Sequence, residues 1–322
     1  MAHRIGIIGA GIMGRRMADR VAAHEKFKLV AAWDPDASAL GALCKAYPSV
    51  AAARDATSLC AREDIDCVYI AAPPAYHAVH AHAAFDHGKA AFCEKPLTVD
   101  DAEGEALVAR AEREQRRAGV NFSLAGAPSF RKVADTIATG VLGPIVRIDI
   151  QVRFRRWPRG WQEGASAWLA GSREGGFTRE VVSHFLFTTQ RLVGPVEVLR
   201  SKVTRPDAAQ AERAIAAEMH ANDVAVALDG AVAGDADDHN LWTVTCARGA
   251  LRIRDWHGLE RRNGDGWIVM ETSSIDDMRV TAGRAQLDDL AAMLEARPHA
   301  LPSLREGLNV QRTVEALLRG RT

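Results

Sequence analysis

A lysine and a glycine-rich turn are the residues of this 322-residue chain whose types and spacing best suit chemistry. Lys95 follows the apolar run Ala90-Ala91-Phe92-Cys93, which is typical of a buried strand. Far upstream, Gly9–Gly14 has the G-x-G-x-x-G spacing of a turn that holds a dinucleotide. Doubly wound sheets bind ligands at the carboxyl ends of their strands. The pair therefore predicts an ammonium group beside a nicotinamide ring.

The glycine turn follows an apolar strand and begins a helix, as a pyrophosphate site requires. Gly9 permits the tight turn, Gly11 the close approach of a pyrophosphate, and Gly14 the packing of helix against strand. N–H groups at the start of the helix would face the phosphates. The alternative is an ordinary glycine turn. The predicted cofactor-binding residues here are Gly9, Ala10, Gly11, Ile12, Met13 and Gly14.

Asp34 ends the second predicted strand, where an acidic residue accepts hydrogen bonds from the adenosine ribose. A 2′-phosphate would be repelled by Asp34 and Asp36, and no arginine or lysine is adjacent to them. The sequence therefore favours NAD, with NADP as the alternative cofactor. The competing interpretation of Asp34 is that it caps the following helix.

Strands and helices alternate over the first 120 residues, which predicts a doubly wound parallel sheet. Beyond residue 123 the pattern changes to period-two strands with turns between them, including turns at 235–238 and 263–266, and this favours an antiparallel sheet. Two helices close the chain, near 286–296 and 305–318. We expect an α/β protein with an NAD(P)-binding domain at 1–122 and a substrate-binding and oligomerisation domain at 123–322.

The composition of the chain limits the classes of protein to which it can belong. With 48% hydrophobic and 25% charged residues the chain is typical of a globular protein. Lys plus Arg equals Asp plus Glu at 41 each, so no net field favours nucleic acid or an anionic membrane. The five cysteines form no CxxC pair, and the first strand begins too early for a signal peptide. These features predict a cytoplasmic enzyme.

The chain resembles the Gfo/Idh/MocA oxidoreductase family. The resemblance lies in the glycine turn, in Pro73-Pro74-Ala75-Tyr76-His77, in Cys93-Glu94-Lys95-Pro96, and in 304–308 with 314–318. It implies a Rossmann domain followed by an α+β domain with an open, mostly antiparallel sheet, whose final helix can pack back on the first domain. It also implies a homodimer or homotetramer.

The resemblance implies roles for individual residues. Lys95 matches the lysine that hydrogen-bonds the reacting substrate oxygen and relays protons. In the segment 175–184, His184 aligns with the catalytic histidine and Glu180 with an aspartate of the substrate site. The cofactor contacts that it implies outside the glycine turn and Asp34 are Ala72, Pro73, His77, Glu94, Lys95 and Pro96.

Several positions depart from the family pattern. Glu180 replaces an aspartate, Val182 a glycine and Phe187 an aspartate. Glu180 and His184 are four residues apart, so on a helix they would share a face. His184 would then take an alcohol proton while Lys95 stabilises the alkoxide. The alternative is that His184 is a structural histidine of an apolar helix.

A basic, aromatic stretch offers a weaker signal. Its arginines would clamp an anionic substrate or face water, and Trp161 would stack on a sugar as a substrate-binding residue or seal a subunit interface. The arginines are Arg153, Arg155, Arg156 and Arg159. His80, His82 and His87 lie on different faces of one predicted helix, and we expect no metal site.

The sequence therefore predicts an NAD(P)-dependent oxidoreductase that acts on a hydroxyl or carbonyl of a small molecule, namely a sugar, cyclitol or related polyol. Two alternatives stay open. One is a regulatory protein that binds the dinucleotide without turnover, which the replacements at Glu180 and Phe187 would suit. The other is an NAD-dependent glycosidase that uses transient oxidation.

Overall fold

The structure is a computed structural model that describes residues 2–234, 237–272 and 274–321. Contacts within it group the chain into two compact units. The first unit runs to Phe122 and includes Gly283–Leu308, and the second comprises Ser123–Ala282 with the residues from Asn309.

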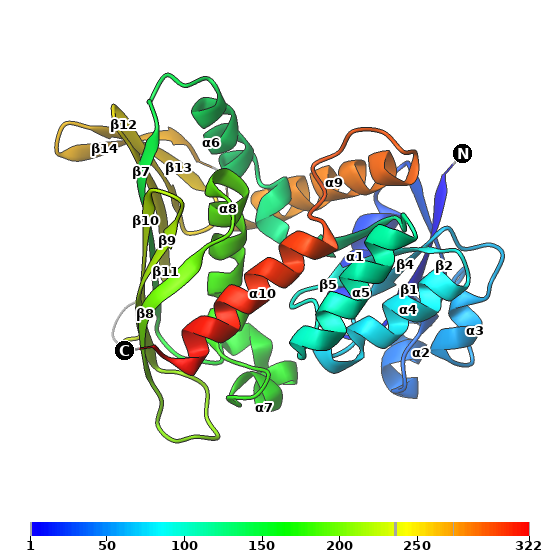
Figure 1. Ribbon diagram of the computed structural model, residues 1–322. Helices are drawn as coiled ribbons and strands as arrows, with labels where there is room; N and C mark the ends of the chain where they lie inside the picture. The colour runs from blue at the N-terminus through cyan, green and yellow to red at the C-terminus, as the bar shows by residue number, and fades with distance from the viewer. Residues whose placement is uncertain (1, 235–236, 273, 322) are drawn as a thin grey trace. The chain divides into compact units, whose positions relative to one another are not determined.

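A six-stranded parallel sheet in the order β3-β2-β1-β4-β5-β6 forms the centre of the first unit (Figure 1). The order reverses direction between β1 and β4, as in doubly wound folds. The predicted Rossmann sheet is confirmed. Its strands are β1 (His3–Ile8), β2 (Phe27–Trp33), β3 (Ala51–Ala52), β4 (Cys67–Ile70), β5 (Ala90–Glu94) and β6 (Ala118–Asn121).

Helices connect these strands, and their boundaries follow from local chemistry. Asp36 and Asp100 cap two of them, because their carboxylates accept N–H bonds from the first turn. β4 and β5 are buried along their whole length, which explains why they are continuous apolar runs. The helices are α1 (Ile12–Ala22), α2 (Ala37–Ala46), α3 (Ala56–Cys60), α4 (His77–Asp86) and α5 (Asp101–Arg113), with a 3₁₀ turn at Pro74–Tyr76.

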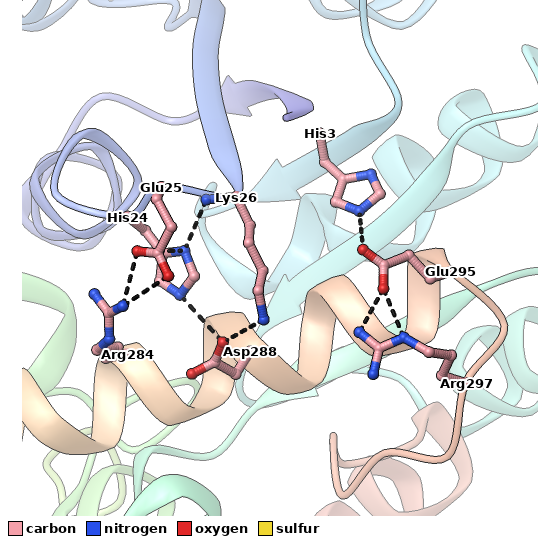
Figure 2. A network of polar contacts seen from close by, with 8 residues as sticks. All are labelled: His3, His24, Glu25, Lys26, Arg284, Asp288, Glu295 and Arg297. Atoms are coloured by element: carbon pink, nitrogen blue, oxygen red, sulfur yellow. Dashed lines mark hydrogen bonds and ion pairs between the residues drawn. The ribbon is translucent and has the colours of Figure 1, made fainter. Parts of the chain in front are cut away.

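The first unit also contains the second half of α9 (Ile275–Leu294), which is longer than the helix expected at 286–296. Gln286 donates to the Phe122 carbonyl, and Arg117 donates to the Leu294 carbonyl, both at 2.8 Å. Arg284 and Asp288 of this helix pair with residues of the turn before β2, and Glu295, which directly follows the helix, pairs with His3 of β1 (Figure 2). This segment is therefore part of the first unit although it lies far away in sequence.

The second unit is built on an eight-stranded sheet in the order β14-β13-β12-β11-β7-β10-β9-β8. All neighbours are antiparallel except β7 and β10. The expected mostly antiparallel sheet is confirmed. Its strands are β7 (Ile145–Phe154), β8 (Glu197–Thr204), β9 (Ala214–Ala221), β10 (Val224–Val232), β11 (His239–Cys246), β12 (Gly249–Arg254), β13 (Gly258–Asn263) and β14 (Gly266–Glu271).

Alternating burial along these strands gives the sheet one buried face, against which helices pack. Trp242 of β11 is fully buried there and donates its indole N–H to the Thr189 hydroxyl at 2.9 Å. The turn expected at 235–238 lies partly outside the described residues. The helices are α6 (Pro128–Ala138), α7 (Ser166–Leu169), α8 (Ser183–Val193) and α10 (Leu304–Arg319), whose first residues belong to the first unit.

In the described ranges, no helix combines the length and apolarity needed to cross a membrane.

Candidate active site

The glycine turn lies between β1 and α1 and has the geometry that its spacing predicts. Gly9 has a φ of +99°, and a Cβ there would lie 2.5 Å from the Ala71 carbonyl oxygen. A Cβ on Gly14 would collide with the Gly9 carbonyl oxygen. By contrast, a Cβ on Gly11 would have no atom within 4 Å beyond its own residue and its two chain neighbours. Gly9 and Gly14 are thus required by the fold itself, whereas Gly11 leaves open space before the N-terminus of α1, where a pyrophosphate fits.

Asp34 is held in place at the carboxyl end of β2 by two N–H groups. One oxygen accepts from Ala10 N at 2.6 Å, and the other from Asp36 N at 2.8 Å. Each oxygen keeps a further lone pair for a ribose hydroxyl. The cap of α2 is Asp36, which accepts from Ser38 N and Ala39 N. The alternative interpretation, that Asp34 caps this helix, is therefore wrong.

Lys95 follows Glu94, the last residue of β5, whose carboxylate is buried in a hydrogen-bonded network. The Tyr69 hydroxyl donates to Glu94, the Asn121 amide donates to Glu94 Oε1 at 2.7 Å, and the Lys95 N–H donates to Oε2 at 3.3 Å. Burial raises the pKa of Glu94, while these donors and the Lys95 charge act in the opposite direction. Three adjacent strands, β4, β5 and β6, thus fix the backbone that carries Lys95.

His77 connects the loops that follow β4 and β5. Its Nδ1 lies 2.8 Å from the Pro96 carbonyl oxygen, and its Nε2 lies 2.8 Å from the Ala72 carbonyl oxygen. A neutral imidazole carries only one N–H, so two carbonyl acceptors favour the protonated ring. Burial opposes this and lowers the pKa of His77. His77 is 1% exposed, so it bridges these two loops from below the surface.

In the second unit, Glu180 lies in a π-helical turn (Thr178–Val182) that leads directly into α8, where His184 is the second residue. The Glu212 carboxylate, 1% exposed, accepts the Thr178 N–H at the start of this turn at 2.7 Å. Hydrogen bonds of the i→i+5 type widen the helix at this turn. Glu180 and His184 therefore do not have the regular α-helical spacing that the sequence predicts. His184 is nearly buried, and Glu180 is half-buried.

Two departures from the family pattern are packing residues here. Val182 is fully buried. Phe187 is 1% exposed, and its ring lies 6.4 Å from Phe130 with the Arg191 guanidinium 4.7 Å above it. An aspartate at position 187 would be a buried charge in these surroundings, which explains why an apolar residue is accommodated.

The basic, aromatic stretch is largely paired within the second unit. Arg153 pairs with Asp229, and Arg155 with Asp237. Arg159 stacks over three rings, of which Trp161 is nearest at 4.8 Å. Trp161 is 48% exposed. These pairs disfavour an anion clamp made from Arg153 and Arg155 and leave Trp161 as an exposed aromatic surface.

Within the described part of the chain, no group of three or more His, Cys, Asp or Glu residues is arranged to hold a metal ion. Of the three histidines noted in the sequence, His82 lies 3.2 Å from an Arg110 nitrogen, and His80 packs against Trp33 and Tyr76.

Residues 3–122 match the family model described as the Gfo/Idh/MocA oxidoreductase family with an NAD-binding Rossmann fold. Inositol 2-dehydrogenase of Rhizobium meliloti is 26% identical over 99% of this chain and 97% of its own length. The chain therefore matches this family over its first domain, and it is similar to the inositol 2-dehydrogenase over both units. Its first domain is therefore an NAD-binding Rossmann domain, as predicted.

Other known proteins are similar to part of this chain in sequence or to nearly all of it in fold. A 1-carboxy-3-chloro-3,4-dihydroxycyclohexa-1,5-diene dehydrogenase of Comamonas testosteroni is 38% identical over 96 residues, which are 30% of this chain and 24% of that protein. Among solved structures, an oxidoreductase from Agrobacterium radiobacter in complex with NAD+, L-tartaric acid and magnesium superposes with a TM-score of 0.84. It covers 98% of this chain and 95% of its own, at 17% identity, and so supports the fold alone.

Sequence reasoning missed the partners of the buried carboxylates. Tyr69 and Asn121 lie in separate strands, and only the register of the sheet brings them to Glu94. Glu212 precedes β9 and reaches a turn far away in sequence. The available signal was a polar residue, Glu94 or Asn121, at the end of each of two neighbouring apolar strands, since buried polar groups need partners.

Proposed function

We propose that this protein is an NAD-dependent dehydrogenase of a sugar, a cyclitol or a related polyol. The observation that carries the proposal is the carboxyl edge of the first sheet, where the glycine turn, Asp34 and the strand end before Lys95 are each fixed by backbone or buried side-chain bonds. The full-length relative that is named an inositol 2-dehydrogenase supports a polyhydroxylated substrate.

The residues of the first domain suit NAD. The N–H groups at the start of α1 would hold the pyrophosphate, and Asp34 would accept the adenosine ribose hydroxyls. The fixed Asp34 carboxylate would repel a 2′-phosphate, which favours NAD over NADP. Ala72, Pro73, His77, Glu94 and Pro96 would shape the loops around the nicotinamide end.

When bound, NAD supplies the hydride acceptor, and the protein supplies alignment and proton transfer. We assign Lys95 to hold the reacting oxygen as negative charge develops on it, since an ammonium donates up to three hydrogen bonds. We assign His184 to take the hydroxyl proton, Glu180 to bind a neighbouring hydroxyl, and Trp161 to stack on the sugar face. Residues 1–122 would form the cofactor domain and 123–322 the substrate domain of a homodimer or homotetramer.

A substrate screen tests the proposal. Purified protein is incubated with NAD and a panel of cyclitols, aldoses, polyols and sugar acids, and the near-ultraviolet absorbance of reduced nicotinamide is followed. Net reduction with at least one substrate, slowed at least about a hundredfold in Lys95→Met, is the expected result. Product without net reduction would indicate a glycosidase. NAD binding without turnover on any panel member would favour a regulatory protein.

A further inference from the structure

The turn between β12 and β13 carries a tryptophan in a backbone conformation that bulky residues rarely adopt. Arg254 pairs with Gly258, so the loop consists of Asp255, Trp256 and His257. Asp255 has a φ of +49° and Trp256 a φ of +76°. Positive φ brings Cβ close to the backbone, and such positions normally hold glycine or asparagine. A tryptophan persists there only where its surroundings hold it, and such strain gathers at functional sites.

The neighbouring strand β11 holds this turn. The Asp255 N–H donates to the Asn240 carbonyl at 2.8 Å, and Asp255 Oδ1 accepts the Asn240 N–H at 2.8 Å. His239 Nδ1 lies 3.0 Å from the same carboxylate oxygen. The two opposed bonds to Asn240 fix Asp255 on the sheet, so the direction of the next side chain, Trp256, is fixed as well.

The Trp256 indole contacts the helix that carries His184. The ring centroids of Trp256 and His184 are 5.4 Å apart with an interplanar angle of 77°, an edge-to-face arrangement. Phe185 flanks the indole at 5.1 Å with an interplanar angle of 32°. His184 is 7% exposed, and Trp256 is half-buried. The indole therefore limits the rotation of the imidazole about its Cβ–Cγ bond.

We infer that Trp256 is a positioning residue that sets the ring orientation of His184 for proton transfer, an inference that rests on the catalytic role proposed for His184. The strained turn keeps the indole against the imidazole before and after the proton moves. A base held in one orientation reacts faster than one that rotates, because misplacement by about 1 Å costs on the order of a hundredfold in rate. Trp256 thus acts on kcat through His184 and does not bind the substrate itself.

Three variants test this assignment. Trp256→Ala removes the indole, Trp256→Phe keeps an aromatic ring at the same place, and Trp267→Ala removes a tryptophan of the same sheet that stacks on Arg252 at 4.1 Å. We expect kcat of Trp256→Ala to fall about tenfold to a hundredfold with a much smaller change in KM. Its solvent deuterium isotope effect on kcat should rise, because proton transfer becomes slower. Trp256→Phe should recover most of kcat, and Trp267→Ala should match the wild type.

A spectroscopic readout makes the test independent of turnover. The ring-proton signal of His184, identified by its loss in His184→Ala, should shift in Trp256→Ala and stay in place in Trp267→Ala. An unshifted signal, or wild-type kcat in Trp256→Ala, would overturn the inference. If His184→Ala is inactive while Trp256→Ala turns over normally, only the positioning role is wrong. If His184→Ala turns over normally, the proposed function of His184 is wrong and the inference fails with it.

Discussion

The two units position their candidate functional groups by different means. In the first, Lys95 follows a strand end whose carboxylate is bonded by Tyr69 and Asn121. In the second, His184 follows a π-helical turn and packs against an aromatic side chain on a strained loop. The first arrangement is a set of hydrogen bonds between parallel strands, and the second is packing around an irregular helix.

This difference affects how easily substrate specificity can change in evolution. The edge of a parallel sheet tolerates few changes of side chain, because each strand end must meet its neighbours in register. Helix packing can accept new side chains if volume is conserved. The second unit accordingly accommodates Val182 and Phe187 as core residues, while the first retains the complete Glu94-Lys95-Pro96 segment. We therefore expect the cofactor to be shared with relatives more widely than the substrate.

The largest expected effects come from removing one proton-transfer group in each unit. Lys95→Met and His184→Gln should each lower kcat by about 10²–10⁴-fold, the range typical of general acid–base groups. NAD affinity, measured by calorimetry, should change little in His184→Gln. If either variant keeps wild-type turnover, the corresponding unit does not supply the group that we assign to it.

Next in size is a matched pair within the glycine turn. Gly14→Ala places a methyl group against the Gly9 carbonyl, so it should destabilise the first unit by about 1–3 kcal/mol and weaken NAD binding. Gly11→Ala meets no atom within 4 Å beyond its own residue and its two chain neighbours, so it should leave the unfolding midpoint unchanged and weaken NAD binding alone. Thermal unfolding and NAD titration measure both. Equal midpoints for the two variants would contradict this account of the turn.

The Glu94 network predicts a smaller, pH-dependent effect. Burial raises the pKa of Glu94, so its contribution to stability is complete below the unfolded pKa and is lost as pH rises through the folded pKa. The Tyr69 hydroxyl counters this by favouring the carboxylate. Tyr69→Phe should therefore cost about 1–3 kcal/mol, and more at pH 8 than at pH 5.

Chemical denaturation of Tyr69→Phe at the two pH values measures this cost. Tyr47→Phe, which removes a hydroxyl bonded to Asp19 at an exposed site, is the matched control and should be nearly neutral. The same loss for Tyr69→Phe at both pH values would mean that Glu94 does not titrate between them.

The smallest effect is expected from the ion pairs of α9. Asp288 lies 2.8 Å from Lys26 Nζ, and both side chains are at least 40% exposed. The hydrogen bond from Lys26 lowers the pKa of Asp288, so its contribution is present above the unfolded pKa and lost on acidification. Because solvent screens the pair, Asp288→Asn should cost at most about 1 kcal/mol at neutral pH. A larger loss, measured by denaturation in low salt, would show that this pair anchors the helix.

The same contrast explains what the sequence could predict. The glycine turn and Asp34 are local motifs at strand ends, so one strand and the residues after it suffice to recognise them. The parallel and antiparallel sheets followed from alternation of strands with helices and from period-two patterning. The six-stranded and eight-stranded sheets of the structure confirm both fold predictions.

Other features depend on information that a single sequence does not carry. β8, β9 and β13 have only a weak strand signal in the sequence, since charged side chains interrupt the apolar pattern of β8 and β13 and small alanines weaken that of β9. The π-helical turn was missed because its spacing imitates a regular helix. The contact of Trp256 with His184 joins residues 72 positions apart and has no local signature.

Isotope transfer tests the central claim most directly. A polyol identified in the screen is prepared with deuterium on the carbon that bears the reacting hydroxyl, and the reduced cofactor is examined by mass spectrometry. The account predicts deuterium on the nicotinamide of NADH with the wild type and, in the same reaction time, at most about a hundredth as much with Lys95→Met. Product that forms while the cofactor stays free of deuterium would contradict it.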